Sequence, residues 1–185
     1  MSKTTENLAK AFIGESQARN KYTYFASAAK KEGFEQIAAI FQETADNEKE
    51  HAKRLFKLLG EKTIDVSASV ISGLGDTKEN LKYAAEGEKY EWSTMYPEFE
   101  KTAREEGETA ATDFFREVAE VEAEHEKRYL KLLENVENDK VFKKDRSIKW
   151  KCRNCGYIHE GTEASAVCPA CQHPRAYYEV FAENY

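Results

Sequence analysis

The chain has 185 residues, a formal charge of −6 and 41% hydrophobic residues. It contains no apolar run approaching the roughly 20 residues that a membrane-spanning helix needs, and its first ten residues, MSKTTENLAK, lack the apolar centre of a secretory signal. We therefore expect a cytoplasmic protein with no membrane partner. The acidic mixture of charges also argues against nucleic acid as a partner, because phosphate binding requires a clustered basic surface.

Four helical blocks make up most of the chain. From Thr5 to about Glu134, apolar residues recur at helical spacing, with Gly33 dividing the first pair of blocks and Gly107 dividing the second pair. Residues 61–76 are too irregular for an amphipathic helix and too long for a tight turn, so we interpret them as a crossover. Two helical hairpins joined by one long crossover is the connectivity of ferritin-like bundles, and the sequence predicts such an all-α four-helix bundle.

The boundaries of the third and fourth blocks can also be predicted. Asp76, followed three residues later by Glu79, is typical of a capping box that opens a helix. A charged linker is expected from Asn135 to Lys149, after the fourth block. We place the bundle at residues 1–146 and a second, smaller domain of β and loop structure at residues 147–185.

Acidic side chains interrupt the core-facing stripe of every predicted helix. Continuing the heptad pattern buries five glutamates, which are Glu15, Glu48, Glu88, Glu91 and Glu122. Burying one unpaired carboxylate costs several kcal/mol, and a whole domain is stable by only about 5–15 kcal/mol. No lysine or arginine falls on these stripes nearby, so metal ions are the remaining source of positive charge. The alternative is that the true stripes lie one residue out of phase with this pattern, in which case the five carboxylates would face solvent.

Two histidines strengthen the metal hypothesis. His51 lies three residues after Glu48, and His125 lies three residues after Glu122, so each pair projects from one helix face. The same order of residues occurs in both hairpins, as expected from an internal duplication. One glutamate from each of two helices, with a Glu-x-x-His from each of the other two, is the arrangement of di-iron and di-manganese carboxylate proteins.

The predicted small domain contains all four cysteines. Cys152, Cys155, Cys168 and Cys171 form two C-x-x-C pairs separated by twelve residues. Fewer than about 40 residues cannot bury enough apolar surface to fold alone, so a metal is needed. The spacing fits a tetrahedral thiolate site but does not distinguish zinc from iron. His159 and His173 are not required as ligands, and we expect both at the surface.

Taken together, the motifs resemble the rubrerythrin family over essentially the whole chain. The segments that carry the resemblance are GESQARNKY (14–22), ETADNEKEH (43–51), EGEKYEWSTMYP (86–97), EVEAEH (120–125), WKCRNCGY (150–157) and CPAC (168–171). The resemblance implies a ferritin-like di-iron bundle followed by a rubredoxin-like domain. It also favours iron over zinc at the four cysteines, because zinc has no redox chemistry to serve a neighbouring di-iron site.

The resemblance also implies individual roles. The ligands of the two irons would be Glu15, Glu48, Glu88, Glu122 and His125, with Glu48 and Glu122 as bridges. Glu91 and His51 would be alternative ligands of one iron, since an added carboxylate suits a ferric ion and neutral imidazole suits a ferrous one. Tyr22 and Tyr96 would donate hydrogen bonds to ligating carboxylates, although aromatic core filling is an alternative for both tyrosines.

The function implied by the resemblance is a non-haem di-iron peroxidase that protects against oxidative stress. It would reduce hydrogen peroxide to water with electrons relayed by the thiolate-bound iron. A dinucleotide fingerprint is absent, because Gly73 and Gly75 lack the third glycine and the preceding strand. The electrons would therefore come from NAD(P)H through a separate reductase or rubredoxin. The distance between the two metal sites within one chain predicts a homodimer, or a higher homo-oligomer, in which the small domain of one subunit lies beside the bundle of the other.

Two other functions remain open from the sequence. A ferroxidase or oxygen reductase, or an iron-handling protein, would use the same bundle. A non-enzymatic metal-binding module would carry zinc in the small domain. Metal analysis combined with visible absorption separates these alternatives, because a ferric tetrathiolate site is coloured and a zinc site is not.

Overall fold

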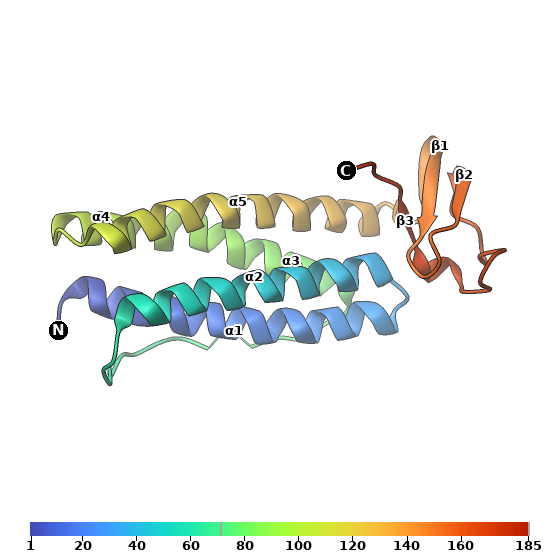
Figure 1. The fold of residues 1–185 in the computed structure, drawn as a ribbon. Helices are drawn as coiled ribbons and strands as arrows, with labels where there is room; N and C mark the ends of the chain where they lie inside the picture. The colour runs from blue at the N-terminus through green and yellow to red at the C-terminus, as the bar shows by residue number, and fades with distance from the viewer. Residues whose placement is uncertain (71, 185) are drawn as a thin grey trace.

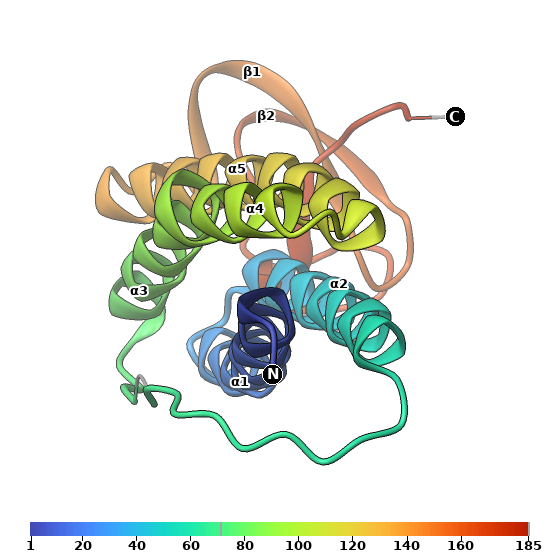
Figure 2. The same cartoon turned by 90° about the vertical axis from the view of Figure 1, so that its left-hand side faces the viewer.

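The computed structural model describes residues 1–70 and 72–184 and consists of a long helical bundle with a small sheet at one end (Figure 1). The helical elements are α1 (Lys3–Lys31), α2 (Glu35–Leu59), α3 (Thr77–Tyr90), η1 (Glu91–Met95), α4 (Tyr96–Glu105) and α5 (Thr109–Glu137). The crossover passes around the outside of α1 on its way from α2 to α3 (Figure 2). This confirms the predicted four-helix, ferritin-like fold. Within the described ranges, no helix is both long enough and apolar enough to cross a bilayer.

The helix ends follow from local sequence. Asp76 accepts a hydrogen bond from the backbone N–H of Glu79, and the Glu79 side chain accepts one from the Asp76 backbone, which confirms the predicted capping box. Gly33 and Gly107 adopt φ values of 84° and 75° in the tight turns of the two hairpins. Glycine adopts this left-handed conformation without the steric cost that a Cβ imposes.

The third predicted helix contains a π-helical turn that the sequence analysis did not anticipate. In η1, the backbone N–H of Tyr96 bonds to the carbonyl of Glu91, five residues earlier. The cause lies one residue further on, because Pro97 has no N–H and its ring would clash with the carbonyl four residues before it. A widened turn relieves that clash, and such turns occur frequently at functional sites. α3, η1 and α4 therefore run on as one interrupted rod (Figure 1).

The bundle core has two hydrophobic layers, one on each side of the buried glutamates. The layer nearer the α1–α2 turn includes Tyr22, Phe25, Phe41 and Tyr129. The layer towards the opposite end includes Leu8, Leu55, Tyr96 and Phe115. Full burial of each large apolar side chain contributes about 1.5–3 kcal/mol. The two layers thus provide the hydrophobic stabilisation that a polar centre cannot.

The small domain is a three-stranded antiparallel sheet in the order β2-β1-β3. Its strands are β1 (Lys143–Cys152), β2 (Ile158–Glu163) and β3 (Tyr178–Val180), with a short 3-10 turn, η2 (Arg175–Tyr177), before β3. The predicted linker from Asn135 to Lys149 is wrong in extent, because α5 continues to Glu137 and β1 begins at Lys143. Residues whose charge had suggested a linker instead pair with β2.

The small domain packs against the α1–α2 turn of the same chain. The rings of Phe34 and Phe142 stack with centroids 6.1 Å apart and planes 7° from parallel. A Cβ placed on Gly33 would lie 3.6 Å from the Cβ of Ala176. These contacts hold the small domain at one end of the bundle, away from the mid-height of the helices (Figure 1).

Candidate metal centres

Four glutamates from four different helical elements meet in the middle of the bundle. Glu15, Glu48, Glu88 and Glu122 are each at most 1% exposed, and they come from α1, α2, α3 and α5. His125 joins them from α5 and is 6% exposed. The helical stripes predicted this burial, and the structure confirms it.

The buried donors form two overlapping groups. One group contains Glu15, Glu48, His51 and Glu122, and the other contains Glu48, Glu88, Glu122 and His125. In each group, one ligand atom per residue lies within 4.8 Å of the others. Glu48 and Glu122 belong to both groups. Two adjacent cation positions that share two carboxylates are the geometry of a two-metal centre.

Each histidine contacts both of the shared carboxylates. The Nδ1 atom of His51 is 2.9 Å from Glu48 Oε2 and 3.0 Å from Glu122 Oε1. The Nδ1 atom of His125 is 2.7 Å from Glu122 Oε2 and 3.3 Å from Glu48 Oε1. The centroids of the two rings lie 6.3 Å apart. The Glu-x-x-His spacing therefore places both imidazoles at the centre.

Glu91 lies at the side of the centre and belongs to neither group. It begins η1, is only half-buried, and lines a cavity between α1, the crossover and α3. Burial, together with the charges of Glu122 and Glu48, raises the pKa of Glu91 to about 8. The stripe pattern grouped Glu91 with the fully buried glutamates, but the π-helical turn gives it a separate position.

The buried carboxylates carry strong mutual repulsion. Burial and the neighbouring Glu48 charge raise the pKa of Glu15 well above its usual value, and the same two causes do so for Glu88. Burial would also raise the pKa of Glu48, but its close contacts with the imidazoles of His125 and His51 outweigh that effect and bring it to about 2. Without metal, Glu15 and Glu88 therefore tend to hold protons, which reduces the negative charge of the centre.

The pKa values of the two histidines are raised, whereas burial alone lowers the pKa of an imidazole. Burial alone would lower the pKa of His125, but the close carboxylates of Glu122 and Glu48 raise it to about 9. The pKa of His51 is raised further, because Glu122, Glu15 and Glu48 together outweigh its burial. The surrounding carboxylates therefore favour a positive charge at both imidazole positions.

Unpaired buried atoms test whether metals fit this centre. Six buried atoms make no well-aligned hydrogen bond among the described residues, although the histidine nitrogens lie close to several of the oxygens. These atoms are Glu15 Oε2, Glu48 Oε1, Glu88 Oε2, both Glu122 oxygens and His125 Nδ1. Leaving one buried polar group unpaired costs about 1–3 kcal/mol, so six at one place require another partner. Carboxylate oxygens and imidazole nitrogens are donors that suit iron and manganese. The residues therefore fit a pair of such ions.

Two tyrosines hold the outer oxygens of the carboxylates. Tyr22 donates a 2.5 Å hydrogen bond to Glu88 Oε1, and Tyr96 donates one to Glu15 Oε1. Both tyrosines are buried. Because each hydroxyl reaches a carboxylate, the alternative of simple core filling does not hold for either side chain.

Sequence reasoning missed one further contact at this site. Trp92, the second residue of η1, donates a hydrogen bond from Nε1 to Glu126 Oε2. Each partner is the chain neighbour of a site residue, but no spacing rule connects positions 34 residues apart on different helices. Only the packing of η1 against α5 brings them together.

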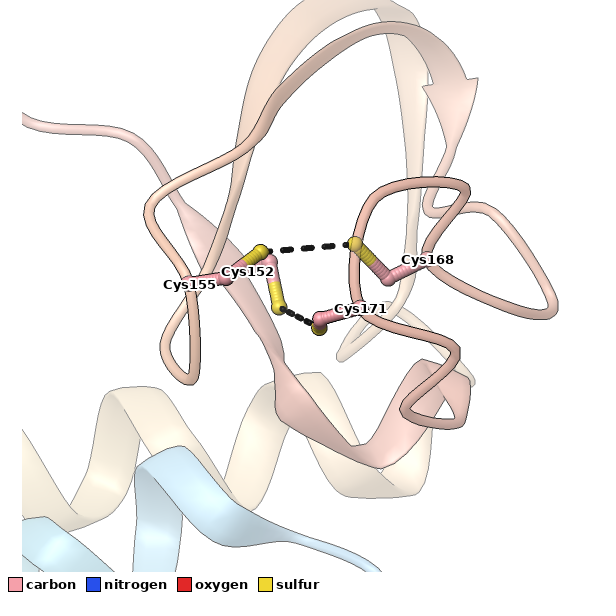
Figure 3. Close-up of side chains that lie close together, drawn as sticks. All are labelled: Cys152, Cys155, Cys168 and Cys171. Carbon is pink, nitrogen blue, oxygen red and sulfur yellow. Dashed lines mark hydrogen bonds between the residues drawn. The ribbon is translucent and has the colours of Figure 1, made fainter.

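The four cysteines of the small domain converge as predicted (Figure 3). The Sγ atoms of Cys152 and Cys171 are 3.7 Å apart, and those of Cys155 and Cys168 are 3.6 Å apart. Cys152 and Cys168 are buried, whereas Cys155 is exposed. Sulfur distances near 3.7 Å fit four thiolates around one tetrahedral ion, since each metal–sulfur bond is about 2.3 Å.

Backbone groups support the thiolates. The backbone N–H of His173 lowers the pKa of Cys171 to about 6. Gly156 adopts a φ of 79° directly after Cys155, which bends the chain around the sulfurs. His159 and His173 face backbone carbonyls, with ring nitrogens 3.1 Å from the carbonyl oxygens of Glu163 and Cys171. Neither belongs to a metal-ligand group within the part of the chain that the structure describes.

Comparison with known proteins identifies the family. The family model described as rubrerythrin matches residues 6–133, and the model for the rubrerythrin rubredoxin-like domain matches residues 150–179. Rubrerythrin-1 of Clostridium acetobutylicum is 56% identical over the whole chain and 97% of its own length. The chain belongs to the rubrerythrin family. Membership and geometry together assign to it a di-iron carboxylate centre and a rubredoxin-type four-cysteine iron centre.

Other rubrerythrin relatives are similar over comparable lengths. The rubrerythrin of Nitratidesulfovibrio vulgaris is 49% identical, covering the whole chain and 97% of that protein. A structure of nigerythrin described as fully reduced and all ferrous superposes with a TM-score of 0.65 at 35% identity. It covers 98% of this chain and 88% of nigerythrin. These relatives place the chain among oxidoreductases with di-iron and rubredoxin-like centres.

Proposed function

We propose that this protein reduces hydrogen peroxide to water in the cytoplasm, with electrons that originate from NAD(P)H and arrive through a separate reductase. The observation that carries the proposal is the sharing of Glu48 and Glu122 between two buried donor groups in a chain that also has a four-cysteine centre. A two-electron site beside a one-electron site suits a reaction in which one substrate takes two electrons.

The residues divide the work at the di-iron centre. Glu15, Glu48, Glu88, Glu122 and His125 would hold the two ions, and Glu48 and Glu122, which belong to both donor groups, would be shared between them. When bound, an iron pair at this centre would supply two-electron reducing chemistry, and the four cysteines would hold an iron that exchanges one electron at a time. Tyr22 and Tyr96 fix the outer oxygens of Glu88 and Glu15, so that these carboxylates keep their orientation as the charge changes.

His51 and Glu91 are the alternative ligands at one position. His51 contacts the donor group that contains Glu15, whereas Glu91 lies outside it. This arrangement supports an imidazole-bound reduced form, since neutral nitrogen suits a ferrous ion. Glu91 stands in a widened helical turn, where a small change of backbone would bring its carboxylate towards the centre.

The electron relay works between subunits in this proposal. The small domain packs at Phe34, and Glu48 lies fourteen residues further along α2, about 21 Å away at the rise of an α-helix. A shallow groove of about 480 Å³ instead lies directly over His125, lined by Asn47, Arg128 and Lys131 among others. In this proposal the small domain of a second copy docks at this groove and is the nearer electron donor.

Turnover experiments test the peroxidase proposal. The iron-loaded protein should consume hydrogen peroxide with NADH and a rubredoxin reductase, and more slowly with dioxygen or excess ferrous iron. A chain with both Cys155→Ser and Cys171→Ser should lose reductase-dependent turnover. It should still oxidise once with peroxide after chemical reduction, which separates loss of the relay from loss of the di-iron centre. Unchanged steady turnover in this variant would remove the relay from the proposal.

Mixed dimers test the direction of the relay. One chain carries Cys155→Ser with Cys171→Ser, and the other carries Glu122→Gln, so that neither homodimer is active. Refolding the two together should restore activity, because the mixed dimer contains one intact di-iron centre facing one intact small domain. An inactive mixture, or a fully active monomer in sedimentation, would contradict transfer between subunits.

A further inference from the structure

A cavity of about 600 Å³ opens beside the di-iron centre. Its walls are one face of α1, residues 67–69 and 72–73 of the crossover, and the α3–η1–α4 rod. Glu91 is part of the wall on the side of the metal centre, and Met95 and Phe99 provide apolar surface beside it. Cavities of about 300–1,000 Å³ are typical of small-molecule sites.

The volume is far larger than hydrogen peroxide requires. One water molecule occupies about 30 Å³ of liquid, and hydrogen peroxide has only two oxygen atoms. A substrate of that size needs a narrow path to the metals rather than a chamber. The cavity therefore has room for an organic group attached to the reacting oxygens.

Two helical glycines keep the walls of this cavity open. Gly14 and Gly87 lie inside α1 and α3, and both line the cavity. Neither has a positive φ, so the backbone does not require glycine at these positions. A Cβ on Gly14 would meet nothing within 4 Å, and one on Gly87 would meet only the Nζ atom of Lys21 at 3.6 Å. Each glycine lowers helix stability by about 1 kcal/mol relative to alanine. In return, the missing side chain leaves the volume of the cavity unfilled.

We propose that this cavity binds organic hydroperoxides, and that the protein reduces them to alcohols. This inference rests on the proposed peroxidase function. The compact apolar group of the substrate packs against Met95 and Phe99, and its O–O group points towards Glu91. The overall reaction is ROOH + 2e⁻ + 2H⁺ → ROH + H₂O. The O–O bond breaks, the carbon–oxygen bond remains, and the ferrous pair supplies both electrons.

Binding can be measured separately from activity. The alcohol 2-phenyl-2-propanol, the product expected from cumene hydroperoxide, should bind to the metal-free protein in saturation-transfer NMR. Gly14→Leu places a side chain in the open cavity and also raises helix propensity, so this variant should fold. It should lower alcohol affinity by about 10-fold or more. Ser27→Leu, at an exposed position of α1 outside the cavity, is the matched control.

Activity then gives a second test. The kcat/KM for cumene hydroperoxide, divided by that for hydrogen peroxide, should fall by about 10-fold or more in Gly14→Leu. The ratio should fall by less in Gly14→Ala, and Ser27→Leu should match the unchanged chain. Absence of alcohol binding, or an equal ratio in all four chains, would overturn the inference. Failure of the unchanged chain to reduce hydrogen peroxide would instead overturn the proposed function, and the NMR measurement would still report on the cavity.

Discussion

The indole Nε1 of Trp92 donates a 2.6 Å hydrogen bond to Glu126 Oε2 and so joins η1 to α5. Trp92 follows Glu91, and Glu126 follows His125. The bond therefore couples the π-helical turn that carries Glu91 to the helix that carries His125. We interpret it as the contact that limits how far the turn moves when Glu91 approaches the metal centre.

Replacing Trp92 with phenylalanine should loosen this turn. A hydrogen bond to a charged group contributes about 1.5–3 kcal/mol, and the partial exposure of both partners places Trp92→Phe towards the lower end of that range. Urea unfolding of the metal-free protein measures the loss. Glu126→Gln is the matched control, because it keeps an oxygen that accepts the bond and should lose less. Equal stability of Trp92→Phe and the unchanged chain would show that the contact does not support the turn.

Tyr22→Phe should weaken metal binding while the fold is retained. The ring still packs against Phe25 and Phe41, but Glu88 Oε1 loses its hydrogen-bond donor. Loss of such a supporting bond typically lowers metal affinity by about 10–100-fold. Competition with a chelator measures the affinity. Tyr24→Phe, which removes the same hydroxyl from an exposed position of α1, should bind metal as the unchanged chain does. Equal affinities for the two variants would contradict a supporting role for Tyr22.

The stability of the metal-free bundle should fall as pH rises. Glu15, Glu88 and Glu91 have raised pKa values in the folded state, so the folded protein holds protons that the unfolded chain has already released. His51 and His125 also have raised pKa values, and their contribution to stability is likewise lost as pH rises through the folded values. All five effects have the same sign. Urea unfolding at pH 6 and above about pH 8 tests this expectation.

Metal loading should release protons and remove much of this pH dependence. Ligands bind in their deprotonated form, so metal affinity should still be rising with pH at about 9, the pKa of the ligand His125. Titration of the metal-free protein with manganese in weak buffer measures the protons released. If loading releases none at neutral pH, the carboxyls are already ionised in the folded state.

Removing the metal from the four cysteines should unfold the small domain and leave the bundle intact. The core of that domain consists mainly of Trp150, Tyr178 and the thiolates themselves, which is too little apolar surface for stability without metal. Trp150 is fully buried. Its fluorescence, measured in Trp92→Phe as the single-tryptophan background, should shift to the red after chelation while the helical circular dichroism persists. An unshifted spectrum would show a domain that is stable without its metal.

Helical periodicity and cysteine spacing determined much of this protein in advance. A repeat of 3.6 residues fixes which side chains face inward, so the burial of Glu15, Glu48, Glu88 and Glu122 followed from the sequence. Local chemistry likewise fixed the capping box at Asp76 and the convergence of the C-x-x-C pairs. The linker predicted for residues 135–149 was wrong in extent, because backbone pairing between β1 and β2 forms a strand even where the side chains are highly charged.

Tertiary structure decided the features that depend on contacts between distant segments. The π-helical turn moves Glu91 away from the fully buried carboxylates, and the Trp92–Glu126 bond joins helices that no local pattern relates. The cavity exists only because the crossover passes alongside α1 and α3. Periodicity specifies the face on which a side chain lies, but the free energies that position whole elements against one another arise from many weak contacts summed over the folded chain.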